Sequence, residues 1–191
     1  APAGNLGIVK QVKGAMNRSR LILFGVLSCL AALAAPGAEV GLIKINGAIG
    51  PATASYITRA IEAAAERENR CLIIQLDTPG GSLESTKRIV QAFYASPVPT
   101  VVYVAPEGAW AGSAGCFITL AADVAAMAPA TSIGAAHPVS IGPGGEEKTS
   151  EVMKEKQEQI TGSFIEGIAN RRGRNAEWAR ASVVESKAIT A

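Results

Sequence analysis

The sequence has few of the residues that build metal sites. Its 191 residues include one histidine, His137, and three cysteines, Cys29, Cys71 and Cys116. A single histidine excludes a histidine-rich metal centre, and the cysteines lack the spacing of zinc ligands. Cys71 and Cys116 lie in apolar surroundings, which favours buried thiols over a disulfide. We therefore expect neither a metal ion nor another cofactor.

The sequence also lacks an excess of charge of one sign. Its 18 basic and 16 acidic residues leave a formal net charge of +2. It contains no basic patch with interleaved aromatic residues, which argues against nucleic-acid binding. The glycine-rich stretch 138–150 has no Gly-Lys-Ser/Thr ending, which argues against a phosphate-binding loop for nucleotides.

No apolar run has the length of an ordinary transmembrane helix, which needs about 20 residues. The run Leu21–Ala35 follows the basic segment Arg18–Arg20 and ends in small residues. This order is typical of a secretory signal peptide. We therefore predict an N-terminal leader at residues 1–38, with the signal peptide at about 16–35 and cleavage near its end. An uncleaved membrane anchor is the alternative.

From residue 39 onward, strand-like and helix-like patterns alternate. Short apolar runs predict strands at 40–45, 71–76, 100–105 and 124–128. Apolar residues at helical spacing predict helices at 53–68, 83–93, 117–122, 149–172 and 176–180. The alternation indicates an α/β domain, with a parallel sheet covered by helices.

Two stretches of this domain have no predicted element. Residues 138–150 are expected to form a loop. Residues 188–191 end the sequence without a terminating helix or strand, so we expect the sequence to be a fragment of its domain.

The stretch from Gly108 to Cys116 places one hydroxyl, that of Ser113, among glycine and alanine. It lies between an expected buried strand and an expected buried helix. Small neighbours let a substrate backbone approach closely, and a helix N-terminus offers free N–H groups to a developing negative charge. The pattern suits a nucleophilic serine. A tight turn that tolerates no larger side chain explains the same residues.

A second glycine-bearing turn, Asp77–Gly81, follows the predicted strand at 71–76. In a parallel sheet both turns lie at the same edge, where ligands bind. With this pair of turns the sequence resembles the ClpP/crotonase superfamily. More closely, it resembles the NfeD-type membrane serine proteases, whose relatives include signal peptide peptidase A.

The resemblance spans about residues 40–191. It rests on four segments in the family's order, which are Leu76–Gly81, Ala109–Gly115, Met127–Pro138 and Gly173–Asn175. The resemblance implies a ClpP/crotonase-like fold, with one serine protease domain at residues 39–191.

The resemblance also implies a Ser-Lys dyad. Ser113 matches the family's nucleophile, and counting back from Gly173 places the family's lysine at Lys156. We expect Lys156 to lie beside an apolar stripe of its helix, where partial burial would favour the neutral amine that can act as a base. The stripe consists of Met153, Ile160, Phe164 and Ile168. The alternatives are a solvated Lys156 and a base at His137.

Backbone groups would complete the site implied by the resemblance. The amides of Gly81 and Ala114 would form the oxyanion hole. Gly80 and Gly112 would border the substrate, since a side chain at the glycine pair 80–81 would block the substrate strand.

The resemblance implies peptide hydrolysis through an acyl-enzyme, outside the cell membrane, on membrane-associated proteins such as stomatin-like partners. Small residues and Trp110 around Ser113 favour apolar segments as substrates. We also expect a homo-oligomer, a dimer or larger.

Other functions fit parts of the pattern. One is a non-catalytic scaffold domain that assembles with stomatin-like membrane partners. A crotonase-like acyl-CoA enzyme is disfavoured because coenzyme A is cytosolic and the leader predicts export. An α/β-hydrolase is disfavoured because Ala111 replaces the first glycine of Gly-x-Ser-x-Gly.

Overall fold

A four-stranded parallel sheet lies at the centre of the part of the chain that the computed structural model describes, which is residues 39–139, 141–142, 145–146 and 150–191. The predicted leader lies outside the described residues. The strands occur in the order β1-β2-β3-β5, all parallel to their neighbours. They are β1 (Gly41–Asn46), β2 (Leu72–Asp77), β3 (Thr100–Val104) and β5 (Val124–Met127).

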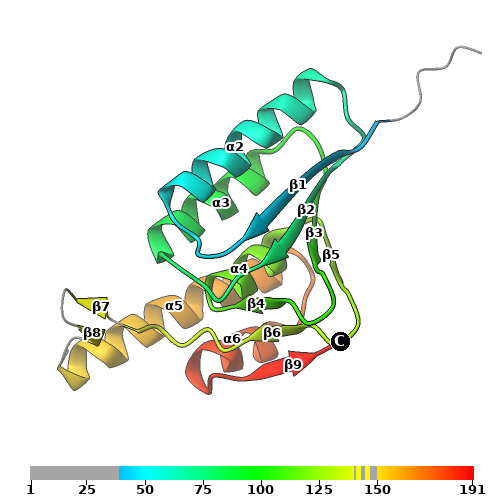
Figure 1. Cartoon of the computed structure of the whole chain (residues 1–191). Helices are drawn as coiled ribbons and strands as arrows, with labels where there is room; N and C mark the ends of the chain where they lie inside the picture. Colours follow the sequence, from blue (N-terminus) through cyan, green and yellow to red (C-terminus); the bar gives the residue numbers. More distant parts are fainter. Residues whose placement is uncertain (1–38, 140, 143–144, 147–149) are drawn as a thin grey trace, which may run out of the picture. The chain divides into compact units, whose positions relative to one another are not determined.

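Three helices connect and cover this sheet (Figure 1). They are α2 (Pro51–Glu66), α3 (Leu83–Ala95) and α4 (Ala114–Ala121). Proline at the first position of α2 sits where its missing N–H costs no hydrogen bond. Ser82 caps α3 by accepting a hydrogen bond from the N–H of Ser85. The observed elements confirm the predicted α/β fold.

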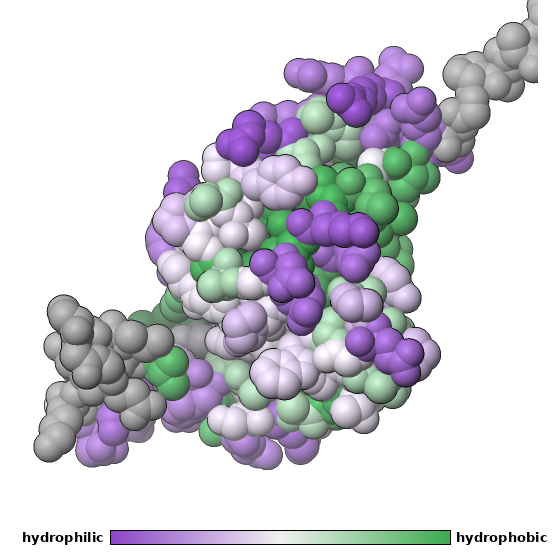
Figure 2. Space-filling view, in the orientation of Figure 1, coloured by the Kyte–Doolittle hydropathy of each residue, from purple (hydrophilic) through white to green (hydrophobic). Residues whose placement is uncertain are grey.

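The two faces of the sheet differ in burial. Leu72, Ile74 and Leu76 of β2 alternate with half-buried residues and belong to the core, together with Ile57 of α2 and Phe93 of α3. The side chains of the opposite face are half-buried or exposed, and hydrophobic residues gather over β1 and β2 in Figure 2. One face of the sheet therefore forms the core and the other is open.

A second sheet contains three short strands in the order β4-β6-β9. β4 (Trp110–Gly112) runs parallel to β6 (Ser132–Gly134), and β9 (Ala188–Thr190) pairs antiparallel with β6. We had expected a turn at β4 and no element at β9, and both expectations were wrong. Strands of three residues are too short to show an alternating apolar pattern.

The C-terminal part contains α5 (Glu151–Arg171) and α6 (Ala176–Val184). The predicted loop at 138–150 includes a small hairpin of β7 (Ile141–Gly142) and β8 (Gly145–Glu146). The prediction that the apolar stripe of α5 is buried is wrong for the first half of the helix, because Met153 and Ile160 are exposed. Only the second half of α5 packs on the domain, through residues that include Ile165 and Ile168.

The described cysteines are free thiols that differ in burial. Cys116 is fully buried in α4, and burial raises the pKa of its thiol to about 12 despite a contact with Ser182. Cys71 is only half-buried, less than we expected. In the described residues we find no helix with the length and apolar character of a membrane span.

The carboxylate of Asp123 connects three elements. It accepts hydrogen bonds from the backbone N–H of Thr100 at 2.8 Å and from its hydroxyl at 2.9 Å. The guanidinium of Arg172, just after α5, donates to the other carboxylate oxygen at 2.6 Å. Burial raises the pKa of Asp123, but these hydrogen bonds and the nearby positive charge outweigh burial and hold the pKa below its ordinary value.

We expect Asp123→Asn to lower the melting temperature by a few degrees at pH 7. A depressed carboxyl pKa contributes stability above the unfolded-state pKa of about 3.9, and this contribution is lost as the pH falls through the folded-state pKa. The difference between wild type and variant should therefore shrink below about pH 4. Thermal unfolding followed by circular dichroism at several pH values measures it, with the exposed Glu62→Gln as control. An equal loss at every pH would contradict this account.

Candidate functional site

Backbone hydrogen bonds join the two glycine-bearing turns. The N–H of Thr78 donates to the carbonyl of Trp110 at 2.7 Å, and the N–H of Gly112 donates to the carbonyl of Thr78 at 3.0 Å. Thr78 and Ala111 form an isolated parallel bridge. The turn after β2 and the turn after β4 therefore meet, as expected, although the two strands belong to different sheets.

Thr78 is a structural residue of the site that we did not predict. Its side chain is fully buried, and its hydroxyl both donates to the carbonyl of Gly80 at 3.2 Å and accepts from the N–H of Gly80 at 3.1 Å. Its methyl group lies against α4, since a Cβ added at Gly115 would lie 2.7 Å from this methyl carbon. The only sequence signal was its place in the Leu76–Gly81 segment.

Ser113 has an unusual backbone conformation. It lies just before α4 with φ 47° and ψ −112°, in a region that costs a residue with a side chain on the order of 1–3 kcal/mol. Its N–H donates to the carbonyl of Gly134 in β6 at 3.0 Å, which holds this conformation. The side chain is half-buried and does not cap the helix. The hydroxyl therefore remains available for chemistry.

Glycine is required beside Ser113 because the chain itself leaves no room. A Cβ at Gly80, where φ is +130°, would lie 2.7 Å from the Cβ of Ser113 and 3.2 Å from its Oγ. A Cβ at Gly81 would lie 2.1 Å from the carbonyl oxygen of Ile49, and one at Gly112 would lie 3.0 Å from the carbonyl oxygen of Pro79. We had attributed the need for glycine at 80–81 to the substrate, whereas contacts within the protein already impose it.

Two backbone N–H groups near Ser113 are free in the described structure. Gly81 and Ile49 form a parallel bridge, but its hydrogen bonds involve the residues on either side of Gly81. The N–H of Ile49 donates to the carbonyl of Gly80, and the N–H of Ser82 donates to the carbonyl of Ile49. The N–H of Gly81 points away from this bridge. Ala114 is the first residue of α4, where an N–H has no acceptor within the helix. Such a pair of donors can stabilise a negatively charged oxygen.

The small residues around Ser113 do not form an apolar lining. Ala109, Ala111 and Ala114 are buried in the core. Trp110, by contrast, is 60% exposed, and its backbone N–H donates to the carboxylate of Asp77 at 3.0 Å. Of the apolar residues expected to contact a substrate, only Trp110 presents a large surface.

Lys156 lies in the exposed first half of α5. Its expected partial burial is not observed, and no hydrogen bond to Ser113 is present within the residues described. Lys154, two residues before Lys156, forms an ion pair with Glu151 at 3.1 Å. The structure therefore does not bring the predicted lysine into contact with the serine.

His137 contacts the backbone of α6. Its Nδ1 lies 3.0 Å from the carbonyl oxygen of Val183 and must donate a proton to it, which leaves Nε2 as an acceptor in the neutral ring. Asp123 does not orient this imidazole, because Thr100 and Arg172 occupy its carboxylate.

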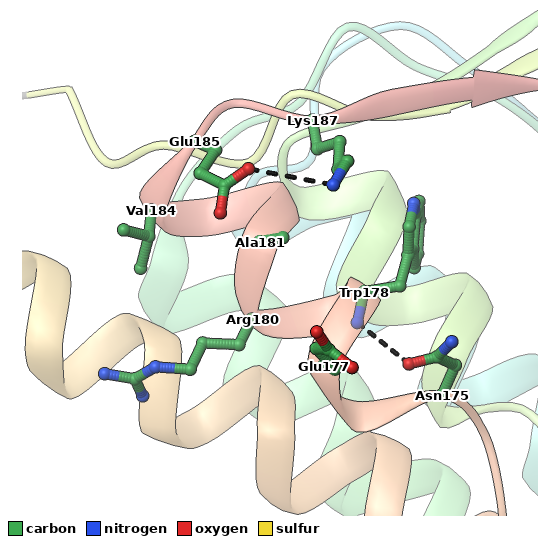
Figure 3. A pocket seen from close by; sticks show the side chains of 8 residues that line it. All are labelled: Asn175, Glu177, Trp178, Arg180, Ala181, Val184, Glu185 and Lys187. Atoms are coloured by element: carbon green, nitrogen blue, oxygen red, sulfur yellow. Dashed lines mark hydrogen bonds and ion pairs between the residues drawn. The ribbon is translucent and has the colours of Figure 1, made fainter.

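A pocket of about 450 Å³ lies along α6 and contains none of the predicted site residues (Figure 3). Its lining carries both signs of charge, including the ion pair between Lys187 and Glu185 at 3.7 Å. Asn175 accepts a hydrogen bond from the N–H of Trp178 and so caps the helix. These groups stabilise α6 and present no nucleophile.

The fold occurs in solved proteases. The 1510-N membrane-bound stomatin-specific protease gives a TM-score of 0.74 as a lysine-to-alanine variant with a substrate peptide and 0.73 as a serine-to-alanine variant, at 33% identity. Each match covers 80% of this chain, and 68% and 72% of the two solved chains. ClpP1 from Listeria monocytogenes gives 0.59 at 19% identity, covering 78% of this chain and 82% of its own, and shows the ClpP-like fold.

Sequence comparison identifies the same group. The membrane-bound protease PH1510 of Pyrococcus horikoshii is 36% identical over 154 residues. The match covers 79% of this chain and 34% of that protein, so the chain spans about a third of its length. The family model of the NfeD1b N-terminal domain matches residues 39–190. The chain therefore belongs to the family of NfeD1b N-terminal domains.

Proposed function

We propose that this chain is a serine endopeptidase with Ser113 as its nucleophile. The observation that carries the proposal is the strained turn at Ser113, which presents an uncommitted hydroxyl at the start of α4. A strained conformation persists only where the surrounding structure maintains it, and such sites are often functional. The proteases among the similar proteins support the same reaction.

The free amides suit the chemistry of acyl transfer. The hydroxyl of Ser113 would attack the peptide carbonyl, and the N–H groups of Gly81 and Ala114 would donate to the resulting oxyanion. Each such donor contributes about 3 kcal/mol to transition-state stabilisation. A base would accept the hydroxyl proton and return it to the departing amine. Water would then hydrolyse the acyl-enzyme.

Lys156 is our candidate for this base. The serine and the lysine altered in the two 1510-N variants are 41 residues apart, the spacing of Ser113 and Lys154 here. We nevertheless favour Lys156, two residues further on, because Lys154 points to another side of the helix. The count back from Gly173 also selects Lys156. Since Lys156 is exposed in the protomer, bound substrate or a neighbouring subunit would have to exclude water from it.

His137 is the alternative base. Its Nε2, the ring nitrogen that does not contact Val183, could accept a proton, but no described carboxylate orients the ring in the way that histidine-dependent triads require. A lysine base needs no third residue. Gly80 and Gly112 would border the substrate without contributing a reacting group.

We propose apolar segments of membrane-associated proteins as substrates. The exposed ring of Trp110 can cover an apolar side chain, and 1510-N is described as stomatin-specific. Stomatin-like proteins are therefore the partners to test first. The membrane-bound relative supports membrane association of this chain, and the predicted leader supports a reaction on the outer side of that membrane.

Labelling with a fluorophosphonate probe tests the function directly. We expect covalent modification of Ser113, identified by peptide mass spectrometry, together with cleavage of apolar peptides in preference to charged ones. An apolar peptide that competes with labelling would link the two observations. A folded protein that neither reacts with the probe nor cleaves any peptide would instead favour the non-catalytic scaffold.

A further inference from the structure

The buried threonine Thr78 contacts both turns of the proposed active site. Its backbone N–H donates to the carbonyl of Trp110, and its carbonyl accepts from the N–H of Gly112, in the turn that carries Ser113. Its hydroxyl bonds to both the N–H and the carbonyl of Gly80 in the other turn. Thr78 therefore links the turn that would supply the nucleophile to the turn that would supply an oxyanion donor.

The bond to the carbonyl of Gly80 fixes the direction of another group, the N–H of Gly81. These two groups belong to one planar trans peptide and point in opposite directions. The carbonyl oxygen of Gly80 accepts from the hydroxyl of Thr78 at 3.2 Å and from the N–H of Ile49 at 2.8 Å. With the carbonyl held on that side, the N–H of Gly81 must point to the opposite side.

This peptide needs a restraint because glycine stands on both sides of it. Gly80 has φ +130°, and neither glycine carries a Cβ that would resist rotation of the peptide. A rotated peptide would present its carbonyl where the N–H now lies, and a carbonyl oxygen repels an oxyanion. A hydrogen bond accepted at the carbonyl also polarises the peptide and strengthens its N–H as a donor. The hydroxyl of Thr78 thus acts on the direction and the strength of the Gly81 N–H.

The methyl group of Thr78 keeps this hydroxyl in position. The methyl carbon occupies space that Gly115 of α4 leaves free, because a Cβ at Gly115 would lie 2.7 Å from it. The methyl and the hydroxyl share one Cβ and rotate together about χ1. A contact that holds the methyl therefore also fixes the direction of the hydroxyl towards Gly80.

We propose that Thr78 is a positioning residue of the peptidase, which holds the Gly80–Gly81 peptide so that the Gly81 N–H serves the oxyanion. The inference rests on the proposed function, since it gives Thr78 a role in the same reaction. Thr78 acts through this peptide and not on the substrate itself.

Thr78→Val removes the hydroxyl and keeps the size of the side chain. We expect kcat to fall at least about tenfold and KM to change less than about threefold, because a misdirected donor weakens the transition state more than the bound substrate. Loss of a whole donor costs about a hundred-fold to a thousand-fold. The effect should be smaller here, since Ile49 still holds the carbonyl. Thr78→Ser keeps the hydroxyl and should recover most of kcat.

Thr100→Val is the matched control. Thr100 is fully buried at the start of β3, at the opposite edge of the sheet, and its hydroxyl also donates one hydrogen bond and accepts another, both with Asp123. Its loss should lower the melting temperature and leave kcat and KM unchanged. If Thr100→Val lost as much kcat as Thr78→Val, the effect would be general destabilisation and the proposal would be wrong.

A substitution at Gly115 tests the role of the methyl. Gly115→Ala presses on the methyl of Thr78 and should lower kcat, while its other neighbours, Ala111 and Leu76, lie at 3.4 and 3.8 Å and allow a Cβ. Thr78→Ser removes the methyl, so the double variant should return to within about threefold of Thr78→Ser alone. A double variant no more active than Gly115→Ala would overturn the proposal.

Hydrogen exchange separates this proposal from the proposed function. NMR of the ¹⁵N-labelled full chain follows the N–H of Gly80, whose described acceptor is the hydroxyl of Thr78. Its exchange should be at least about tenfold faster in Thr78→Val, relative to the N–H of Ser82, which donates to the carbonyl of Ile49.

The combined results distinguish two failures. A wild type that neither cleaves peptides nor reacts with the fluorophosphonate probe would overturn the proposed function, and with it the catalytic role of Thr78. Unchanged exchange at Gly80 in Thr78→Val, or cleavage by this variant at the wild-type kcat, would overturn the role of Thr78 alone.

Discussion

Replacing Ser113 with alanine is expected to reduce peptide hydrolysis by about a thousand-fold or more in kcat. The free amides of Gly81 and Ala114 would remain, but the acyl-enzyme could not form. Alanine differs from serine only by the hydroxyl, which makes no contact that holds the turn. The melting temperature should therefore be nearly unchanged, and this can be measured on the same preparation.

Ser132→Ala is the matched control for this substitution. Ser132 is a half-buried serine in β6, close in the fold to the carbonyl that binds the N–H of Ser113. We expect Ser132→Ala to keep most of the activity. If Ser113→Ala also kept it, then Ser113 would not be the nucleophile, whatever residue the fluorophosphonate probe modified.

Replacing Lys156 with alanine is expected to lower kcat by roughly a hundred-fold to ten-thousand-fold, the usual contribution of a general base. Lys154→Ala is the matched control, since it removes the same charge two residues away on the same exposed helix. The control should lose its ion pair with Glu151 and little activity. Because lysine is a base only as the neutral amine, wild-type activity should also rise towards alkaline pH.

The substitution His137→Ala completes this series. A loss of activity in His137→Ala, with Lys156→Ala active and both proteins folded, would show that the dyad assignment is wrong. A loss in Lys154→Ala instead would select the spacing of 41 residues found in the archaeal relative. Each outcome assigns the base to one of three named residues.

The sequence was sufficient to predict the central sheet and its helices. The strands of the sheet are short, mostly apolar runs, and residues such as Ile57 and Ile61 recur at the spacing of one helical face. The pattern of small residues made Ser113 a candidate but fitted a tight turn as well, and the family resemblance gave Ser113 the role of nucleophile. The structure brings its turn against the turn at Gly80.

The first half of α5 shows where sequence reasoning fails. Met153 and Ile160 follow the spacing of a buried stripe, but the spacing does not reveal whether another element covers that stripe within the protomer. The same limit applies to Lys156, whose environment depends on what packs around α5. The backbone contact of Ile49 with Gly81 was equally hidden, because residues distant in sequence form it.

The pairing of β6 with β9 has a consequence for the order in which the site is completed. Gly134 accepts the hydrogen bond that holds Ser113, and a Cβ at Gly134 would lie 2.2 Å from the carbonyl oxygen of Lys187. The support of the serine turn thus includes residues 187–190, which the ribosome adds long after Ser113. During synthesis, Ser113 is therefore present before the residues of β9, which support its turn through β6.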